Sequence, residues 1–249
     1  MYQYRKYKKT GLFERISNFS IVGKIILITS IISILLFVVE YAFFLNCSGC
    51  ISEGKVVKLP PTYDWFYLKP ANIFQGKYLW TLLTHIFVHG NFFHLFVNMF
   101  VLLSLGGLSE KIIGRKRFLW FYLISGIFAG LLSTFLSGFY GNTVLGARIF
   151  GSPYTYMVGA SGAIFAIAGL FVMLLPRLRF MIIFLPFFSL PAYIMVPLVL
   201  LITWIATILG NFPIGNVAHL GGFLAGISYG YYLKTKYSRK VKALQQMFR

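Results

Sequence analysis

Long apolar runs separated by short basic loops are the feature that most restricts how this chain can fold. Its 249 residues are 58% hydrophobic and only 11% charged, whereas a soluble domain carries roughly a quarter charged residues. A helix of about 20 apolar residues is long enough to cross the hydrocarbon core of a bilayer. We therefore expect an all-α, multi-pass integral membrane protein, built as a bundle of six transmembrane helices.

Six segments have the apolar character expected of membrane helices. They are residues 21–45, 91–108, 118–139, 161–175, 192–209 and 216–233. The first is too long for a signal-peptide core and no small-residue cleavage site follows it, so we expect it to be retained. Two further apolar stretches differ from these six. Residues 79–88, with Trp80 and His85, are predicted to lie at the membrane interface, and residues 180–190 are bounded by prolines.

The positions of the basic residues account for the net charge of +18. These residues cluster at both chain ends and in the short loops 111–117 and 177–179, which is the positive-inside pattern. No basic stripe interleaved with aromatic residues is present, so no nucleic acid partner is expected. The pattern predicts a basic cytoplasmic segment at 1–20, a membrane domain at 21–233 and a basic cytoplasmic tail at 234–249. Both termini are then cytoplasmic, and we expect the plasma or cell membrane.

Four polar side chains are expected at one depth in this bundle. Counting 1.5 Å per helical residue back from the basic residue that follows each helix, Ser161 lies at about 24 Å, His219 at about 22 Å, His94 at about 25 Å and Asn98 at about 20 Å. A serine in a membrane helix usually bonds to its own backbone. An intramembrane histidine is costlier and tends to be functional, so the shared depth indicates a site.

The chemistry that these side chains permit is amide hydrolysis, which needs a nucleophile, a base and donors for the developing oxyanion. Ser161 offers a hydroxyl at a helix N-terminus, where free N–H groups favour negative charge, and His219 can accept its proton. His94 and Asn98 share one helix face and can both donate hydrogen bonds. None of the five carboxylates falls in this layer, which predicts a Ser–His dyad and not a triad.

Small residues beside these side chains predict close helix packing. Gly222, Gly226 and Gly230 form a small-xxx-small ridge on the last segment. The matching small residues of the fourth segment are Gly162, Ala166 and Gly169. Gly159 and Gly162 also allow an unusual turn and close backbone approach beside the serine.

Two other patterns point elsewhere. His85 and His89 have a spacing that suits zinc on a helix, but no carboxylate or cysteine completes the ligand set. We interpret them as hydrogen-bonding loop residues and expect neither a metal nor another cofactor. Cys47 and Cys50 form a Cys-x-x-Cys pair without a second half-site. They are interpreted as two loop thiols, or as one short disulfide if the loop is extracytoplasmic.

At these residues the chain resembles the rhomboid family of intramembrane serine proteases. Four blocks in family order carry the resemblance across roughly residues 79–233: His89-x4-His94-x3-Asn98, Glu110-Lys111-x2-Gly114, Gly159-Ala160-Ser161-Gly162 and Ala218-His219-x2-Gly222-x3-Gly226. Many members carry Trp-Arg before the second helix, whereas here Trp80 is followed by Thr81. This departure bears on the stability of the loop more than on catalysis.

The resemblance implies a role for each site residue. Ser161 would be the nucleophile and His219 the general base, while His94, Asn98 and the serine N–H would form the oxyanion hole. The supporting residues would be His89, Glu110, Gly159, Gly162, Gly222 and Gly226. Among them, the glutamate would tie the loop after the second helix.

The resemblance also implies where substrates are cut. Residues 79–88 would lie partly in the outer leaflet, and the loop 210–216 would cap the site. Substrates would be single-span membrane proteins cut in or near the outer part of their helix. Two alternatives are a non-catalytic rhomboid-like chaperone or adaptor, which typically lacks the serine or the histidine, and a transporter, which usually needs intramembrane carboxylates.

Overall fold

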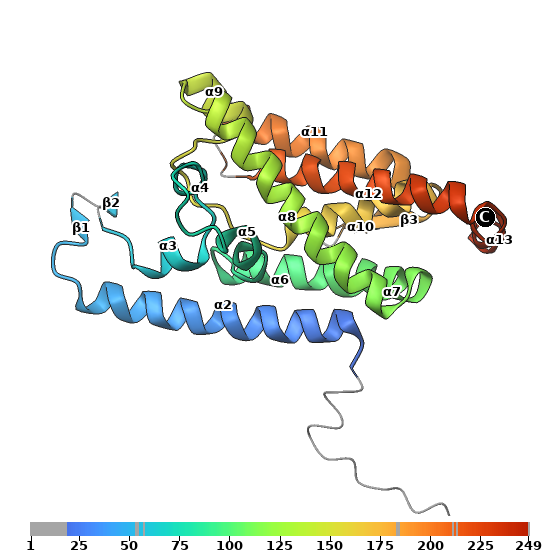
Figure 1. The fold of residues 1–249 in the computed structure, drawn as a ribbon, viewed down its shortest axis with the longest axis horizontal. Coiled ribbons are helices and arrows are strands. Elements are labelled where there is room, and N and C mark those ends of the chain that lie inside the picture. Colours follow the sequence, from blue (N-terminus) through green and yellow to red (C-terminus); the bar gives the residue numbers. More distant parts are fainter. Residues whose placement is uncertain are drawn as a thin grey trace, which may run out of the picture.

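The computed structural model describes residues 19–52, 55–56, 58–182, 185–210, 212 and 214–248, and it is mostly helical. The predicted basic segment 1–20 lies almost entirely outside the described residues. Figure 1 shows α2 along one edge of the molecule, α11 and α12 toward the opposite edge, and α6 and α10 between them.

Four helices are long and apolar enough to cross a membrane. They are α2 (Ile21–Asn46), the continuous helix Phe92–Ile113, α8 (Arg115–Tyr140) and α11 (Ala192–Gly210). The second of them consists of α6 (Phe92–Val101), a π-helical turn η2 (Leu102–Gly106) and α7 (Gly107–Ile113). The other two expected segments form the shorter apolar helix α10 (Ser161–Leu174) and α12 (Asn216–Lys236).

Short elements fill the connections. Helices α3 (Thr62–Phe66), α4 (Pro70–Phe74) and α5 (Thr81–Thr84) and the 3₁₀ turn η1 (His85–Phe87) lie between α2 and α6. Helix α9 (Val144–Phe150) follows α8. The predicted basic tail contains a further helix, α13 (Ser238–Met247), whose Val241 is buried against the bundle.

The all-α expectation is wrong for two small hairpins. Strands β1 (Ile51–Ser52) and β2 (Lys55–Val56) pair antiparallel, as do β3 (Arg179–Ile182) and β4 (Leu185–Pro191). The second hairpin occupies the Pro-bounded stretch 180–190. Proline is unfavourable in a helix interior because it lacks an N–H and clashes with the preceding turn. The single Pro197 is accommodated within α11, whereas the stretch 180–190 is short and bounded by prolines, which favours strands although it is apolar.

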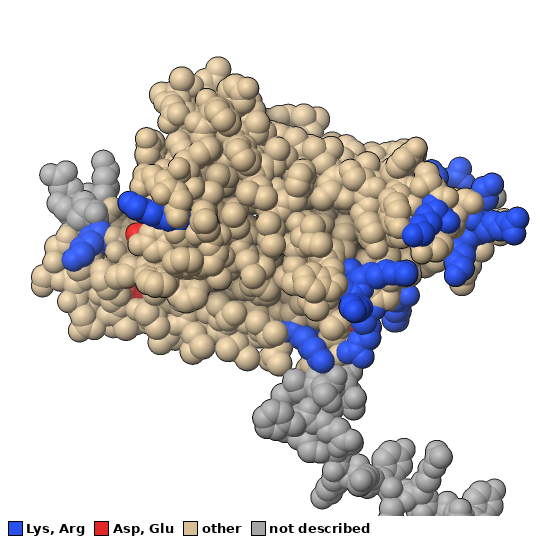
Figure 2. All heavy atoms as spheres, in the orientation of Figure 1, with Lys and Arg blue, Asp and Glu red and all other residues tan. Residues whose placement is uncertain are grey.

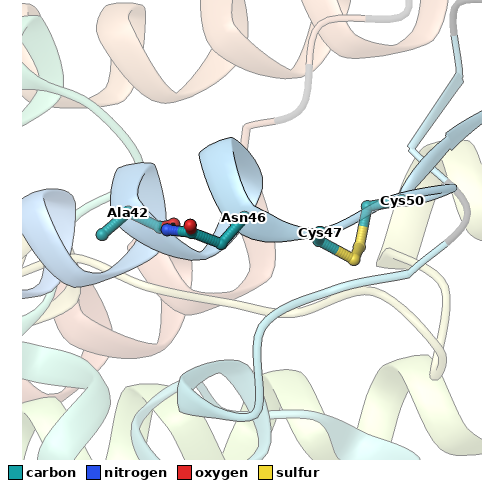
Figure 3. The surroundings of a disulfide bond; sticks show 4 residues. All are labelled: Ala42, Asn46, Cys47 and Cys50. Atoms are coloured by element: carbon teal, nitrogen blue, oxygen red, sulfur yellow. Dashed lines mark hydrogen bonds between the residues drawn. A yellow bond between two sulfur atoms is a disulfide. The ribbon is translucent and has the colours of Figure 1, made fainter.

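The two cysteines form one short disulfide. Cys47 follows the end of α2 and is bonded to Cys50, immediately before β1 (Figure 3). The second of the two interpretations offered by the sequence is therefore the one that the structure adopts. A disulfide is typical of an oxidising compartment, and this one lies at the opposite end of α2 from the basic loop 111–117.

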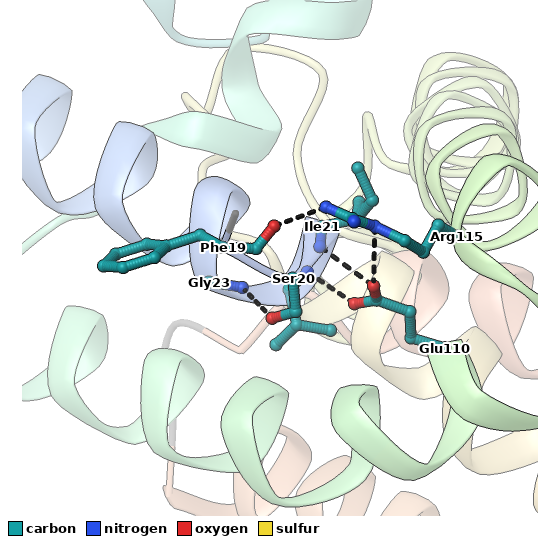
Figure 4. A network of polar contacts seen from close by, with 7 residues as sticks. Phe19, Ser20, Ile21, Gly23, Glu110 and Arg115 are labelled. Carbon is teal, nitrogen blue, oxygen red and sulfur yellow. Dashed lines mark hydrogen bonds and ion pairs between the residues drawn. The ribbon is translucent and has the colours of Figure 1, made fainter. Parts of the chain in front are cut away.

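A buried carboxylate fastens the start of α2 to the end of α7. Glu110 accepts hydrogen bonds from the backbone N–H groups of Ile21 (3.0 Å) and Val22 (2.9 Å), and its carboxylate lies 3.6 Å from the Arg115 guanidinium (Figure 4). The first N–H groups of a helix have no partner within the helix, and the helix dipole favours an anion there. This contact joins the first helix to the C-terminal part of the second, so Glu110 has a structural role here, although it lies within α7 and not in the expected loop.

Candidate active site

Ser161 and His219 meet between the starts of two helices. Ser161 is the first residue of α10, and His219 lies in the first turn of α12. The serine Oγ and the histidine Nε2 are 2.8 Å apart, within hydrogen-bonding distance, although the residues are 58 positions apart in the chain. Both side chains remain partly exposed. The two polar residues that the sequence places at equal depth are thus in direct contact.

Glycines allow α10 and α12 to approach closely enough for this contact. A Cβ on Gly222 would collide with the Gly162 carbonyl group, and a Cβ on Gly226 would collide with the carbonyl group of Ala166. On the other helix, a Cβ on Gly169 would collide with the backbone of α12. The predicted small-residue packing is confirmed, and the contact between Gly222 and Gly162 lies within one turn of each member of the Ser–His pair.

Packing orients the imidazole of His219. Its ring stacks on Phe165 with the centroids 4.4 Å apart and the planes 20° apart. The Nδ1 atom is buried and has no hydrogen-bond partner among the described residues. The three acids that the structure describes are engaged elsewhere: Glu40 with Tyr67 and Thr62, Asp64 with Tyr156 and Asn72, and Glu110 with α2.

The sequence analysis missed Phe165. Its spacing of four from Ser161 places both on one face of α10, which was the available signal.

His94 lies beside the serine, on the far side of Gly159. Gly159 has a φ of +116°, and a Cβ there would lie 2.9 Å from His94 Nε2 and 3.8 Å from Ser161 Oγ. An L-residue would be strained in this conformation and would collide with the imidazole, so glycine is required on both counts. Asn98 is buried, and its amide donates to the backbone carbonyl of His94 at 2.9 Å. That bond uses one of its two N–H groups.

His89 contacts two segments of the chain near the site. Its Nδ1 lies 3.1 Å from Ser33 Oγ, and its Nε2 lies 3.5 Å from the Ala160 nitrogen, whose N–H points to it. Ser33 also contacts the Phe87 carbonyl oxygen at 3.2 Å. Because Nε2 accepts the hydrogen bond from the Ala160 N–H, it carries no proton, and the ring proton is on Nδ1. The ring is therefore neutral, and its Nδ1–H donates to Ser33 Oγ. His89 thereby links α2 to the residue preceding Ser161.

The other histidine in this region is also hydrogen bonded. His85 Nδ1 lies 2.9 Å from the Thr81 carbonyl oxygen. Within the described part of the chain, no group of three His, Cys, Asp or Glu side chains could hold a metal ion. The His85 ring is hydrogen bonded to the first residue of α5.

At Thr81, where many family members have arginine, the side chain has a hydrogen-bond partner within its own turn. Its buried hydroxyl donates to the Tyr78 carbonyl at 2.7 Å. The neighbouring Trp80 indole N–H donates to the Trp65 carbonyl at 2.9 Å. The bond from Trp80 holds the start of α5 against α3, and the bond from Thr81 closes the turn that begins α5, without an arginine at position 81.

A polar network that the sequence analysis missed holds the segment leading to Gly159. Asp64 accepts hydrogen bonds from the Tyr156 hydroxyl (2.6 Å) and from Asn72 (2.9 Å). Next to it, Leu68 and Met157 form an isolated antiparallel bridge. Burial and the hydrogen bond to Asp64 raise the pKa of the Tyr156 phenol. A neutral phenol donates its proton to the carboxylate, which keeps residues 156–157 against the α3–α4 region.

The fold and the site together define a bundle of apolar helices with a serine–histidine pair at the starts of two of them. The chain belongs to the rhomboid family, because the rhomboid domain matches residues 76–236. Family membership and the apolar spans together make it an integral membrane protein.

Several curated relatives are similar over the same region. The chain is 35% identical over 148 residues to the presenilin-associated rhomboid-like protein, mitochondrial, of Bos taurus, which covers 59% of this chain and 36% of that protein. It is 33% identical over 165 residues to rhomboid-like protease 1 of Toxoplasma gondii, an alignment that covers 65% of this chain and 49% of that protein. It is 28% identical over 176 residues to rhomboid protein 1, mitochondrial, of Saccharomyces cerevisiae, which covers 68% of this chain and 47% of that protein.

These alignments span between about a third and a half of the length of the relatives. Two of the three relatives are named as mitochondrial proteins. The expected location in a plasma or cell membrane therefore gains no support from them.

Proposed function

We propose that this protein is an intramembrane serine endopeptidase that hydrolyses peptide bonds in or near the transmembrane helices of other membrane proteins. The observation that carries the proposal is the 2.8 Å contact between Ser161 Oγ and His219 Nε2. A nucleophile within hydrogen-bonding distance of a base is the arrangement that activates a serine. Membership of the rhomboid family and the similarity to a relative named as a protease support it.

The proposed reaction uses the dyad twice. His219 Nε2 accepts the Ser161 hydroxyl proton as Oγ attacks the substrate carbonyl carbon, and the imidazolium then protonates the leaving amine as the C–N bond breaks. Water attacks the resulting acyl-enzyme, giving a proton to His219, which returns one to Ser161 Oγ as the ester bond breaks. None of the carboxylates that the structure describes takes part in the proposed reaction, so the stack on Phe165 and the helix packing keep the imidazole in position.

The oxyanion of each tetrahedral intermediate needs preorganised donors. Ser161 occupies the first position of α10, where the backbone N–H has no intrahelical partner. In our proposal this N–H, the His94 imidazole and the free N–H of the Asn98 amide stabilise the negative charge. The position of His94 beside Gly159 and Ser161 supports its role.

We also propose that six helices cross the membrane with both termini in the cytoplasm. The clustering of lysine and arginine near Arg115, Arg177 and Lys234 and the disulfide at the opposite end of α2 support this orientation. The active site then lies below the extracytoplasmic surface. A single-span substrate helix must unwind locally to reach it, because each exposed backbone group is costly in lipid, so helix-weakening residues near the cleaved bond should favour cleavage.

Labelling with a fluorophosphonate probe tests the proposal directly. The purified full-length protein in detergent is expected to be labelled, whereas Ser161→Ala and His219→Ala are expected to lose labelling and to remain folded by circular dichroism. Ser104→Ala is a matched control, because Ser104 is an exposed helical serine whose hydroxyl bonds to the Phe100 carbonyl. Labelling that survives Ser161→Ala would contradict the proposed nucleophile. A well-folded wild type that is neither labelled nor able to cleave a membrane substrate would favour the non-catalytic alternative.

A further inference from the structure

A groove on the lipid-facing side of the bundle lies between α8 and α12, away from the Ser–His pair. Its volume is about 590 Å³, which is within the range of about 300–1,000 Å³ for pockets that hold small molecules. The large side chains that wall it include Trp120, Ile124 and Phe128, one helical turn apart on α8. Small residues on both helices leave the space between these walls. They are Ser125, Ala225 and Ser228.

The groove is about as long as one leaflet is thick. Between Arg117 and Phe128, which lie toward its two ends on α8, there are eleven residue steps, or about 17 Å of helix. Half of the hydrocarbon core of a bilayer is about 15 Å. Trp120, Ile124 and Phe128 are exposed in the isolated chain, so this surface faces acyl chains when the bundle lies in a membrane.

The charge at one end of the groove is positive and unopposed. Lys116 and Arg117 line that end and make neither a hydrogen bond nor an ion pair with any residue that the structure describes. The only described carboxylate nearby, Glu110, is occupied by α2 and Arg115. Figure 2 shows lysine and arginine side chains gathered at this end of the molecule, with almost no acidic surface between them.

A second hollow continues from the same arginine. It measures about 530 Å³ and lies under α13, with Arg117, Lys111 and Lys240 among its lining residues and with Val241 and Leu244 on the α13 side. Apolar walls and cations thus meet at Arg117 from two directions. Arginine suits this position because its planar guanidinium can bind a phosphate through two parallel hydrogen bonds.

From this arrangement we infer that the protein carries a binding site for an anionic glycerophospholipid. One acyl chain lies in the groove between α8 and α12, and the phosphate lies against Arg117 and Lys116. A zwitterionic lipid with the same chains would bring its own cation to this cluster of basic residues, so the site selects lipids with net negative charge. The occupant belongs to the leaflet at the basic end of the bundle, whichever membrane contains the protein.

Native mass spectrometry of the full-length protein in detergent tests the inference. Dioctanoyl phosphatidylglycerol and dioctanoyl phosphatidylcholine serve as the two probes. The wild type is expected to bind phosphatidylglycerol more tightly than phosphatidylcholine. Arg117→Gln is expected to weaken the binding of phosphatidylglycerol about fivefold, the usual effect of one basic residue near a lipid surface. Lys242→Gln is the control, because Lys242 carries the same charge on exposed α13 surface and lines neither hollow.

A second variant tests the acyl-chain groove itself. Ser228 is exposed and lines the groove, so Ser228→Trp fills the space without entering the core and should reduce the binding of both probes. Equal affinity of the wild type for the two lipids would overturn the inference. So would a loss of binding as large in Lys242→Gln as in Arg117→Gln, since that would indicate diffuse attraction to the basic surface. Lipid binding is measured without proteolysis, so these outcomes are independent of whether Ser161 is catalytic.

Discussion

Replacing Gly222 by alanine should separate the Ser161 and His219 side chains of the proposed dyad while leaving both residues in the chain. The added Cβ would lie 2.8 Å from the Gly162 carbonyl carbon and closer still to its oxygen, whereas ordinary contacts of this kind begin at 3.4 Å. Both neighbours are backbone atoms, so relief requires α12 to move away from α10 by more than 1 Å. The Ser161–His219 distance would then grow from 2.8 Å to beyond the ~3.2 Å limit for efficient proton transfer.

Two effects of Gly222→Ala are expected and can be measured separately. Overpacking of this kind costs about 1–3 kcal/mol of stability, which thermal unfolding in detergent reports. A misplacement of about 1 Å at a catalytic group can reduce the rate about 100-fold, which the initial rate of fluorophosphonate labelling reports for the folded protein. Gly226→Ala produces the same kind of collision, with Ala166, one turn further from His219. It should lower the melting temperature similarly and slow labelling much less.

The control for glycine replacement itself is Gly107→Ala. Gly107 has helical backbone angles, and a Cβ there would meet nothing within 4 Å. Alanine is favoured over glycine within a helix by about 0.5–1 kcal/mol, so this variant should be slightly more stable and label at the wild-type rate. Wild-type labelling and melting of Gly222→Ala would refute the reasoning that close packing of α10 against α12 sets the Ser161–His219 distance.

Three further predictions follow from individual contacts. Glu110→Gln should destabilise the protein by about 2 kcal/mol, because hydrogen bonds to a charged acceptor are the stronger ones, while the labelling rate of the folded fraction stays unchanged. Burial lowers the pKa of His89 to about 3, against about 6.5 in an unfolded chain. Below about pH 6.5 a proton therefore binds His89 in the unfolded state and not in the folded state, which favours unfolding. As the pH is lowered, the melting temperature should thus fall less steeply in His89→Gln than in the wild type. Maleimide should add to Cys47 and Cys50 only after reduction, as intact-mass measurement can show, and addition without reduction would contradict the disulfide.

The helices could be predicted from the sequence because their signal is local. Each of the six apolar segments lies almost entirely within a helix of the structure, and the ends differ by a few residues only. The hairpin of β3 and β4 could not be predicted in the same way, because a short apolar run is compatible with strand or helix until its prolines are considered. Helix α13 was missed for a different reason. It is only ten residues long and mixes basic and apolar residues, and its apolar residues face a surface only when α7, α8 and α12 are assembled.

The candidate site shows the same division between local and distant information. Ser161 and His219 could be paired from the sequence because both begin apolar helices at equal distance from a basic residue. The hydrogen bonds that hold the surrounding backbone could not be predicted in this way. Tyr156 pairs with Asp64 across 92 positions, and His89 reaches Ala160 across 71. Nothing in the spacing of these residues indicates a partner, because the partners come together only when the whole bundle is assembled.

The position of α10 is fixed from both of its ends, and in the proposed mechanism this packing takes the place of the third residue of a triad. At the N-terminal end, His219 stacks on Phe165 and the glycines of α12 lie against the α10 backbone. At the C-terminal end, Gln245 of α13 donates a hydrogen bond of 3.0 Å to the Leu174 carbonyl, one of the carbonyl groups that a helix end leaves without a partner. A triad orients its histidine with a carboxylate. Here the orientation depends on how α10 packs along its whole length, so the geometry at Ser161 is a property of the bundle, including the helix that lies across its basic end.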